Sequence, residues 1–452
     1  MELQLLSDQR VVLSATPATG GAPAIFLVNG GFAEAISNLN LTEQSVSTAL
    51  NSACTSLTEQ AQERTAAQQD LLDTCEGLLD LSDAEASEVI SSLAPDEIIA
   101  QADVSMAVSN QQVSGVSNRL NALRSGGLGA LDLSALNFSY NGQSLPLNHF
   151  AQYLIEEASG DEGGSSTLTT PWAFFVNGNV SFGDRDQTNS ESGFDFTIPI
   201  LTAGVDYRLG SDTVVGAALG YSEASADFDS NGGDLDVDSL ALSVFGTWYK
   251  GEGIYFDGLI KLSSNDYDTS RSISDSQAML GSTDGTEYSV NLSAGYNAYR
   301  GATSYSGYGR VSYVDIDIDA YTETASNPTA AGAGSVLAIG DQQTQSLTTV
   351  LGAQLNHNFS FESGILIPQI QLEWEHQHAD NSRVISAQFV YDPTNTSFDV
   401  FTGSPDRDYF NLSVGFSVIS KNGKFGFLNF ETKINQDDVT HNSITGGLRF
   451  EF

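Results

Sequence analysis

The sequence has few basic residues and no long apolar run. Of its 452 residues only 17 are Lys or Arg, against 57 Asp or Glu, which gives a formal net charge of −40 at pH 7. A nucleic-acid binder must neutralise phosphates with clustered basic side chains, so this balance argues against nucleic acid as a partner. Hydrophobic residues make up 40% of the chain and aromatic residues 10%, which excludes global disorder.

Two further absences concern the membrane. No stretch of 18 or more apolar residues occurs, which excludes a transmembrane helix, whereas a membrane β-barrel escapes such a search. The first residues, Met1–Gln4, lack the basic region, apolar region and cleavage site of a signal peptide. We therefore interpret the chain as a mature or truncated fragment, or as one read from an internal start.

Cysteine is nearly absent as well, since only Cys54 and Cys75 occur. We predict a single disulfide formed in an oxidising compartment, with two free buried thiols as the alternative. The bridge would staple two neighbouring helices and add on the order of 3 kcal/mol to a module with a small core.

The residue composition changes twice within the first third of the chain. Residues 1–35 mix short apolar runs with Gly, Pro and Thr, and we interpret them as a β-rich remnant of an upstream domain. Residues 36–125 show apolar spacings of three and four, which predicts a helical domain with helices at roughly 42–53, 58–79, 82–93 and 95–124. Expected helix starts are Thr42, Thr58, Ser82 with its capping-box partner Glu85, and Pro95. Residues 126–170 contain a further short helical stretch followed by a Gly/Ser/Thr linker.

After Pro171 the period becomes two and stays two to the end of the chain. Tyr288, Val290 and Leu292, for example, alternate with small or polar residues. Twelve such runs occur, centred near residues 176, 203, 218, 244, 258, 292, 311, 352, 369, 414, 430 and 446. Short turns alternate with long polar connections, among them 226–239 and 264–285.

This alternation of short and long connections favours a membrane barrel over a soluble β-sandwich. Apolar side chains would face lipid, and small or polar side chains would fill the lumen. The predicted fold is mainly β: a twelve-stranded antiparallel transmembrane barrel at 171–452 with a helix in its pore, preceded by the small helical domain.

The last strand carries the most specific motif. Thr445, Gly447, Phe450 and the terminal Phe452 fit the pattern polar-x-Gly-x-x-aromatic-x-aromatic. This resembles the C-terminal signal that the outer-membrane barrel assembly machinery of Gram-negative bacteria reads, and a terminal strand with unpaired backbone groups is suited to strand addition.

Together with the twelve strands and the linker, this motif makes residues 171–452 resemble the translocator domain of classical autotransporters. Leu372–His376 and Asp406–Asp408 are similar to that family's final third. The resemblance implies a barrel in the Gram-negative outer membrane that carries an N-terminal passenger to the cell surface and keeps a helix in its pore. It also implies contact with outer-membrane lipid, the assembly machinery and periplasmic chaperones, and we expect a monomer.

For the pore helix we favour residues 145–158, and the helix at 95–124 is the rival. The favoured segment carries the side chains His149, Tyr153, Glu156 and Glu157. Its fourteen residues rise only about 21 Å, short of a roughly 30 Å hydrocarbon core, so extended linker would complete the crossing.

Five charged residues have the parity of the lumen face. They are Asp257, Lys261, Arg310, Glu373 and Arg449. Either they meet the pore helix, or they pair with one another and hold the barrel rigid.

The acidic loop from residue 227 has spacings that suit calcium. Asp227, Asp229, Asn231, Asp234 and Asp238 offer oxygen ligands with a Gly at the sharp turn, although the loop joins two strands rather than two helices. A solvated acidic loop is the alternative to a weak calcium site. No catalytic motif occurs, so we expect neither enzymatic activity nor a cofactor.

The sequence thus predicts an outer-membrane translocator that anchors its passenger at the cell surface. The alternatives are a surface adhesin that uses the barrel only as an anchor, and a passive porin with an N-terminal plug. An enzyme encoded upstream of Met1 is a third class that these residues do not test.

Overall fold

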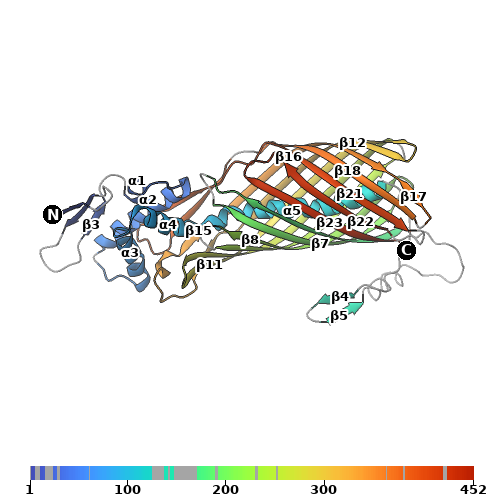
Figure 1. Cartoon of the computed structure of the whole chain (residues 1–452). Coiled ribbons are helices and arrows are strands. Elements are labelled where there is room, and N and C mark those ends of the chain that lie inside the picture. The colour runs from blue at the N-terminus through green and yellow to red at the C-terminus, as the bar shows by residue number, and fades with distance from the viewer. Residues whose placement is uncertain are drawn as a thin grey trace.

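A computed structural model gives the structure of the chain. It describes residues 2–5, 11–15, 24–27, 31–60, 62–124, 137–140, 143–146, 171–188, 192–229, 233–250, 253–362, 364–379, 382–420 and 425–451. Twelve strands close into a barrel, and helices lie inside it and beyond one of its ends (Figure 1).

All twelve barrel strands pair antiparallel with their neighbours along the chain, and the pairing of the last strand with the first closes the ring. The strands are β6 (Trp172–Arg185), β7 (Phe194–Arg208), β8 (Thr213–Phe228), β9 (Asp234–Tyr249), β10 (Gly253–Ser274), β11 (Gln277–Arg300), β12 (Thr303–Ile318), β16 (Gln342–His357), β18 (Gly364–Gln377), β21 (Asp408–Ser420), β22 (Phe425–Ile434) and β23 (Val439–Glu451). The predicted number and position of the strands are confirmed.

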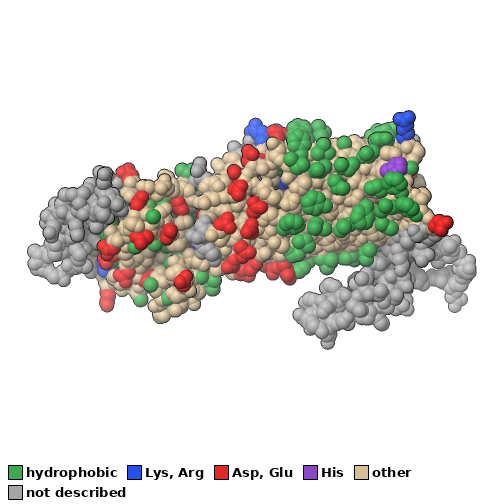
Figure 2. All heavy atoms as spheres, in the orientation of Figure 1, with side chains coloured by type: hydrophobic (Ala, Val, Ile, Leu, Met, Phe, Trp, Pro, Cys, Tyr) green, Lys and Arg blue, Asp and Glu red, His purple; other side chains and the backbone are tan. Residues whose placement is uncertain are grey.

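The barrel wall is apolar outside and polar inside. Leu351 on β16 is 60% exposed on the outer face, whereas Lys261 on β10 is fully buried in the lumen. Figure 2 shows, on the face in view, the outward hydrophobic side chains gathered in a band across the barrel, with carboxylates concentrated beyond its edge on the side of the helices. Lipid can solvate the apolar band, and the paired strands leave no backbone group unsatisfied within it.

The two ends of the barrel differ. Short turns such as Gly301–Ala302 lie at the end that holds the C-terminus, and we call this the short-turn end; the opposite end, where β10 and β11 project, is the long-hairpin end (Figure 1). The expected loop at 264–285 is wrong, because β10 and β11 stay paired up to the turn at Asp275 and Ser276. Beyond the lipid, polar outward side chains cost nothing, and buried Tyr267 and Arg271 preserve the alternation.

Five helices precede the barrel in the described residues: α1 (Phe32–Ala35), α2 (Leu41–Glu59), α3 (Ala66–Leu78), α4 (Asp83–Leu93) and α5 (Asp96–Arg124). Ser82 forms the expected capping box with Glu85. The expected caps Thr42 and Thr58 are wrong. Asn40 and Thr65 instead cap α2 and α3, each with its own capping box. No helix among the described residues is both long and apolar enough to cross a membrane.

Helices α1 to α4, residues 31–94, form a unit that we call the cap, at the long-hairpin end. The cap shares one hydrophobic core with the loop strands β15 (Leu337–Ile339), β19 (Val384–Phe389) and β20 (Ser397–Phe401). Buried Phe32 joins α1 to this core, so the cap begins before the expected boundary at residue 36. The expected helical domain of 36–125 is also too long, because α5 leaves the cap and enters the barrel (Figure 1).

The remaining strands are short. β13 (Tyr321–Thr322) extends the loop sheet, β14 (Thr324–Ala325) pairs with β11, and β17 (Phe359–Phe361) pairs with β18; η1 (Ala333–Ser335) is a single 3-10 turn. At the N-terminal end, β1 (Glu2–Leu5), β2 (Val11–Ala15) and β3 (Ala24–Leu27) form an antiparallel sheet, and β4 (Asn137–Tyr140) pairs with β5 (Gln143–Pro146).

Candidate functional site: a helix inside the barrel lumen

The lumen holds α5, which crosses the barrel from the long-hairpin end to the short-turn end (Figure 1). Its backbone runs closest to β6–β10 and β12. A helix of 29 residues rises about 43 Å, enough to cross a roughly 30 Å hydrocarbon core. The pore helix in this structure is therefore the rival segment at 95–124. The favoured segment lies outside the described residues except for its first two, which belong to strand β5, so its side chains His149, Tyr153, Glu156 and Glu157 are not placed.

Apolar side chains fix each half of α5 against the wall. Ala100, Val104 and Val108 pack in one buried cluster with side chains of β7 to β10 and β12. Val113, Val116 and Leu120 pack in a second cluster nearer the short-turn end, with Phe175 and Phe245. These contacts align the helix with one half of the barrel wall.

Between the two apolar clusters lies a fully buried ion pair. The Lys261 ammonium lies 2.8 Å from the Glu287 carboxylate. Ser109 on α5 donates to Glu287 at 2.5 Å and accepts from Lys261 at 3.0 Å, and Lys261 also donates to the Gln112 side chain at 2.9 Å. The helix thus completes the polar contacts of a charge pair that belongs to the wall, as a buried pair requires.

Two arginines near the end of α5 contact acids of the wall. Arg119 donates to Asp206 at 2.6 Å, and its guanidinium lies 5.4 Å from the centre of the Phe175 ring. Arg124 forms an ion pair with Asp257. Both acids project from strands into the lumen, so these pairs tether the C-terminal turns of the helix to the wall.

Gly115 lets the helix approach the wall closely. Asn177 on β6 donates to the Gly115 carbonyl at 2.9 Å. A Cβ at this position would lie 3.1 Å from the Asn177 and Thr202 side-chain oxygens. The side chains of Asn177 and Thr202 must shift by a few tenths of an ångström to admit a small side chain here, and a bulky side chain would push the helix away from β6 and β7.

The other expected lumen charges pair within the wall. Arg310 on β12 forms an ion pair with Glu373 on β18 at 2.9 Å, and Tyr308 donates to the same carboxylate at 2.5 Å. The side chain of Arg449 lies outside what the structure describes. Both expected arrangements therefore occur: Asp257 and Lys261 contact the pore helix, and Arg310 and Glu373 hold each other.

A buried arginine joins the cap to the barrel. The Arg271 guanidinium on β10 contacts Glu323 at 2.6 Å and donates to the carbonyls of Ser92 and Leu93 at the end of α4. Glu97, in the first turn of α5, is buried close by. Burial raises the pKa of Glu97 well above its ordinary value of 4.5; Arg271 opposes this rise, and Asp96 and Glu323 add to it.

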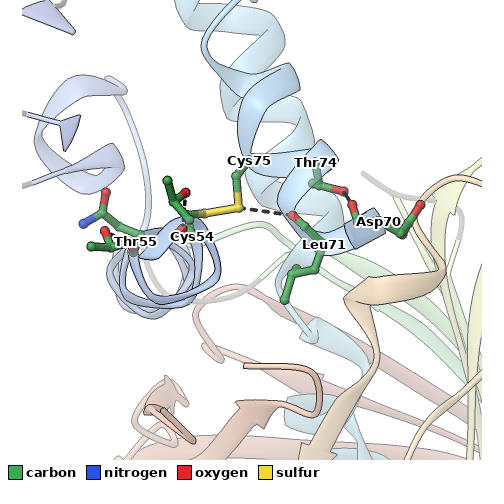
Figure 3. Close-up of a disulfide and its surroundings, with 8 residues drawn as sticks. Cys54, Thr55, Asp70, Leu71, Thr74 and Cys75 are labelled. Carbon is green, nitrogen blue, oxygen red and sulfur yellow. Dashed lines mark hydrogen bonds between the residues drawn. A yellow bond between two sulfur atoms is a disulfide. The ribbon is translucent and has the colours of Figure 1, made fainter. Parts of the chain in front are cut away.

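Cys54 on α2 and Cys75 on α3 form the disulfide expected from the sequence, with an S–S distance of 2.03 Å. Figure 3 shows the bond linking the two helices, with the Cys75 sulfur 3.1 Å from the carbonyl of Leu71. Nearby, the Asp70 carboxylate accepts hydrogen bonds from the backbone of Gly332 and Gly334 in the loop before β15, at 3.1 and 2.6 Å. The stapled pair of helices is thereby fixed to a loop of the barrel.

The acids of the expected calcium loop lie on the outside of β8 and β9. Asp227 and Asp234 pair in register, and Asp229 and Asp238 are exposed, while Asn231 lies outside the described residues. Burial raises the pKa of Asp238, and neighbouring acids, Glu223 foremost, raise it further. In the part of the chain that the structure describes, no three His, Cys, Asp or Glu side chains gather as a metal site.

The C-terminal motif lies on β23, the strand that closes the ring by pairing with β6. Thr445 is buried in the lumen and accepts from Asn179 at 2.6 Å. A Cβ at Gly447 would lie 2.3 Å from the Phe427 ring, so only glycine fits there. The side chain of Phe450 and the whole of Phe452 lie outside the description.

The family model of the autotransporter β-domain matches residues 174–431, more than half of the chain. This chain belongs to the autotransporter β-domain family. Its barrel is therefore an outer-membrane translocator of a Gram-negative bacterium.

One solved structure and two curated relatives illustrate what the chain is similar to. The translocator domain of the autotransporter NalP from Neisseria meningitidis matches with a TM-score of 0.50 and 17% identity, over 68% of this chain and 95% of that one, which shows the shared fold. The uncharacterized protein YaiT of Escherichia coli K12 is 24% identical over 52% of this chain and 23% of its own length. The probable autotransporter YpjA of the same organism is 25% identical over 44% of this chain and 12% of its own. The chain thus spans less than a quarter of the curated relatives it matches.

The sequence analysis did not predict that α5 residues such as Arg119 and Arg124 contact the wall, nor that Asp206 and Glu287 accept these contacts. The sequence nevertheless contains features that point to them. Glu287 precedes Tyr288 on a strand whose parity is clear, and Arg119 and Arg124 are basic residues in a chain that has few. The rise of 1.5 Å per residue makes a helix at 95–124 long enough to cross the membrane and a helix at 145–158 too short, so length distinguishes the two candidates.

Proposed function

We propose that this chain carries an N-terminal passenger across the outer membrane and anchors it at the cell surface. One observation carries the proposal: the polypeptide passes through its own lumen. β6 begins at the short-turn end, whereas α5 enters from the long-hairpin end, and the cap lies beyond that end (Figure 1). In bacterial outer-membrane barrels short turns face the periplasm and long loops the exterior, which puts the cap and everything before it outside the cell.

The greater length of the curated relatives supports an upstream passenger. The sheet of β1–β3 is then the end of that passenger, and the cap is the stalk between passenger and barrel. Transport in this scheme is threading of the chain rather than catalysis, and the translocator acts as a monomer.

We further propose that the barrel assembly machinery and periplasmic chaperones are its partners during insertion. The support is the position of the C-terminal motif: β23 supplies the strand that closes the ring against β6, so β23 is unpaired on that side until closure. The requirement for glycine at Gly447 ties the motif to the packing of this strand.

A display experiment tests the proposed transport. A small epitope with an export signal is fused before Pro95, which keeps α5 and removes the cap, and before residue 1 of the full chain. We expect antibody labelling on intact cells for both fusions, and none for a Gly447→Trp version of either, since its barrel fails to close. An epitope that stays in the periplasm while the barrel is folded and protease-resistant would contradict the proposal.

A further inference from the structure

Two histidines lie side by side on the outer face of the barrel, at the edge nearest the long-hairpin end. His376 on β18 and His378 directly after that strand continue the outward alternation of Leu372 and Trp374. The centres of the two imidazole rings lie 4.7 Å apart. Trp374 is the last large apolar side chain on the strand before them, so the pair stands just beyond the apolar band, at the level where lipid headgroups begin.

Hydrogen bonds to the neighbouring strands orient both rings. The Asp408 carboxylate on β21 accepts from Trp374 Nε1 at 3.0 Å and lies 2.8 Å from His376 Nδ1. On the other side of β18, the Thr349 hydroxyl of β16 lies 3.0 Å from His378 Nε2. The remaining nitrogens, Nε2 of His376 and Nδ1 of His378, contact no polar group among the described residues. Once a ring is protonated, its remaining nitrogen is a donor for a ligand.

The charge at this edge of the apolar band differs between the two sides of the barrel. Four exposed acids, one on each of β8–β11, stand in register there: Glu223, Asp238, Asp266 and Asp284. They repel an anionic headgroup. Beside the histidines, the charge of Asp408 is matched by that of Arg407, which is exposed next to it in the chain. Protonation of the two rings therefore gives this side a net positive charge.

We propose that the histidine patch, which comprises Trp374, His376, His378, Arg407 and Asp408, binds the phosphate of a lipid in the outer leaflet. A phosphomonoester fits best, because its negative charge and three free oxygens match two imidazolium donors and a guanidinium. The acyl chains of the same lipid lie on the apolar band, where Leu351 and Phe410 flank Trp374 in register. This binding is separate from transport, because it requires no passenger.

Native mass spectrometry of the full chain in detergent, titrated with phosphatidic acid in the presence of EDTA, tests the proposal. Phosphatidic acid carries a phosphomonoester, and phosphatidylcholine with the same acyl chains is the matched lipid without net charge. EDTA removes divalent cations that bridge phosphates to the acids of β8–β11. We expect a high-affinity complex with phosphatidic acid but not with phosphatidylcholine, and tighter binding at mildly acidic than at mildly alkaline pH.

Two outcomes of this titration would overturn the proposal. Equal affinity for the two lipids would mean that the acyl chains alone are bound. Complete displacement of phosphatidic acid by inorganic phosphate at equal concentration would assign the site to the free ion, since that ion lacks the chains that the apolar band should hold.

Substitution of the imidazoles sharpens the test. His376→Gln/His378→Gln keeps two polar side chains of similar size, and it should weaken binding of phosphatidic acid about tenfold or more and remove its pH dependence. Arg407→Gln should weaken binding by a smaller factor. As control, His357→Gln removes an imidazole from the outer face of β16 at the short-turn end and should leave the affinity unchanged. Wild-type affinity in the double histidine variant, or an equal loss in His357→Gln, would refute the histidine patch as the binding site.

Discussion

The cap and α5 come from one continuous helical stretch of sequence, yet the two regions are stabilised in different ways. The cap buries leucines and isoleucines in a core that includes loop strands of the barrel, as a soluble domain does. Beyond its first turn, where Ile98 and Ile99 belong to the core of the cap, α5 is held by two modest apolar clusters and by charge pairs whose acids belong to the wall. The difference follows from the surroundings: cap residues face water or one another, whereas a lumen helix must match a wall whose inner face is polar.

The largest expected effect is a loss of α5 docking when the buried ion pair of Lys261 and Glu287 is broken. Lys261→Met leaves the Glu287 charge buried without its partner and should cost about 3–5 kcal/mol of α5 docking, while the double variant Lys261→Met/Glu287→Leu should recover most of it. Hydrogen exchange of the α5 amides in the full protein measures the loss. As control, Arg310→Met breaks a pair that does not contact α5 and should leave the exchange of α5 unchanged. Equal loss of α5 protection in both variants would show that the helix is not held by its own contacts.

The core of the cap gives the next effect. Leu57 is fully buried, so Leu57→Ala should destabilise the cap by about 2–5 kcal/mol, whereas Leu41→Ala at an exposed position should change it by about 0.5 kcal/mol or less. The urea concentration at which residues 31–94 become sensitive to protease measures both variants. Protection of α5 should not change in either beyond its first turn, where Ile98 and Ile99 share the core of the cap. A cap that resists urea equally in the two variants would mean that the shared core does not hold it.

Removal of the disulfide should act on the cap alone. Cys54→Ser/Cys75→Ser should lower the stability of the cap by about 3 kcal/mol, because the reduced chain regains the entropy of an open loop. The same urea and protease assay applies, with reduced wild type as the matched sample. A change in α5 exchange of similar size would contradict the separation of the two regions.

The smallest effect is a pH dependence at the junction of cap and helix. The folded-state pKa of Glu97 is above its unfolded value of 4.5, so the folded state holds the proton more tightly. Stabilisation from this proton is complete below pH 4.5 and is lost as pH rises toward the folded pKa, by at most about 1.4 kcal/mol per pH unit. Glu97→Gln should flatten the profile of the cap's urea midpoint as pH rises above 4.5. An unchanged profile in the variant would assign the dependence to other groups.

The sequence was sufficient to predict the barrel, because each lipid-facing position must be apolar and every strand therefore alternates apolar and polar residues. It was sufficient for the disulfide because no other thiol competes. It was not sufficient for the loops: Leu337, Phe389 and Phe398 stand in or beside short apolar runs, and their burial depends on contacts with the cap, which is distant in the sequence. The pore helix was misassigned because both candidates are polar and only their lengths distinguish them.

The position of α5 is best tested by cross-linking in intact outer membranes. Oxidation of the Gly115→Cys/Thr202→Cys variant, read as a mobility shift on a non-reducing gel, should join helix and wall in most molecules. A matched Gly115→Cys/Ser413→Cys variant places the second cysteine on β21, on the other side of the lumen. This variant should not form the cross-link. Equal yields in the two variants, or free thiols in the first while Cys54 and Cys75 are bonded, would show that α5 does not lie against this wall.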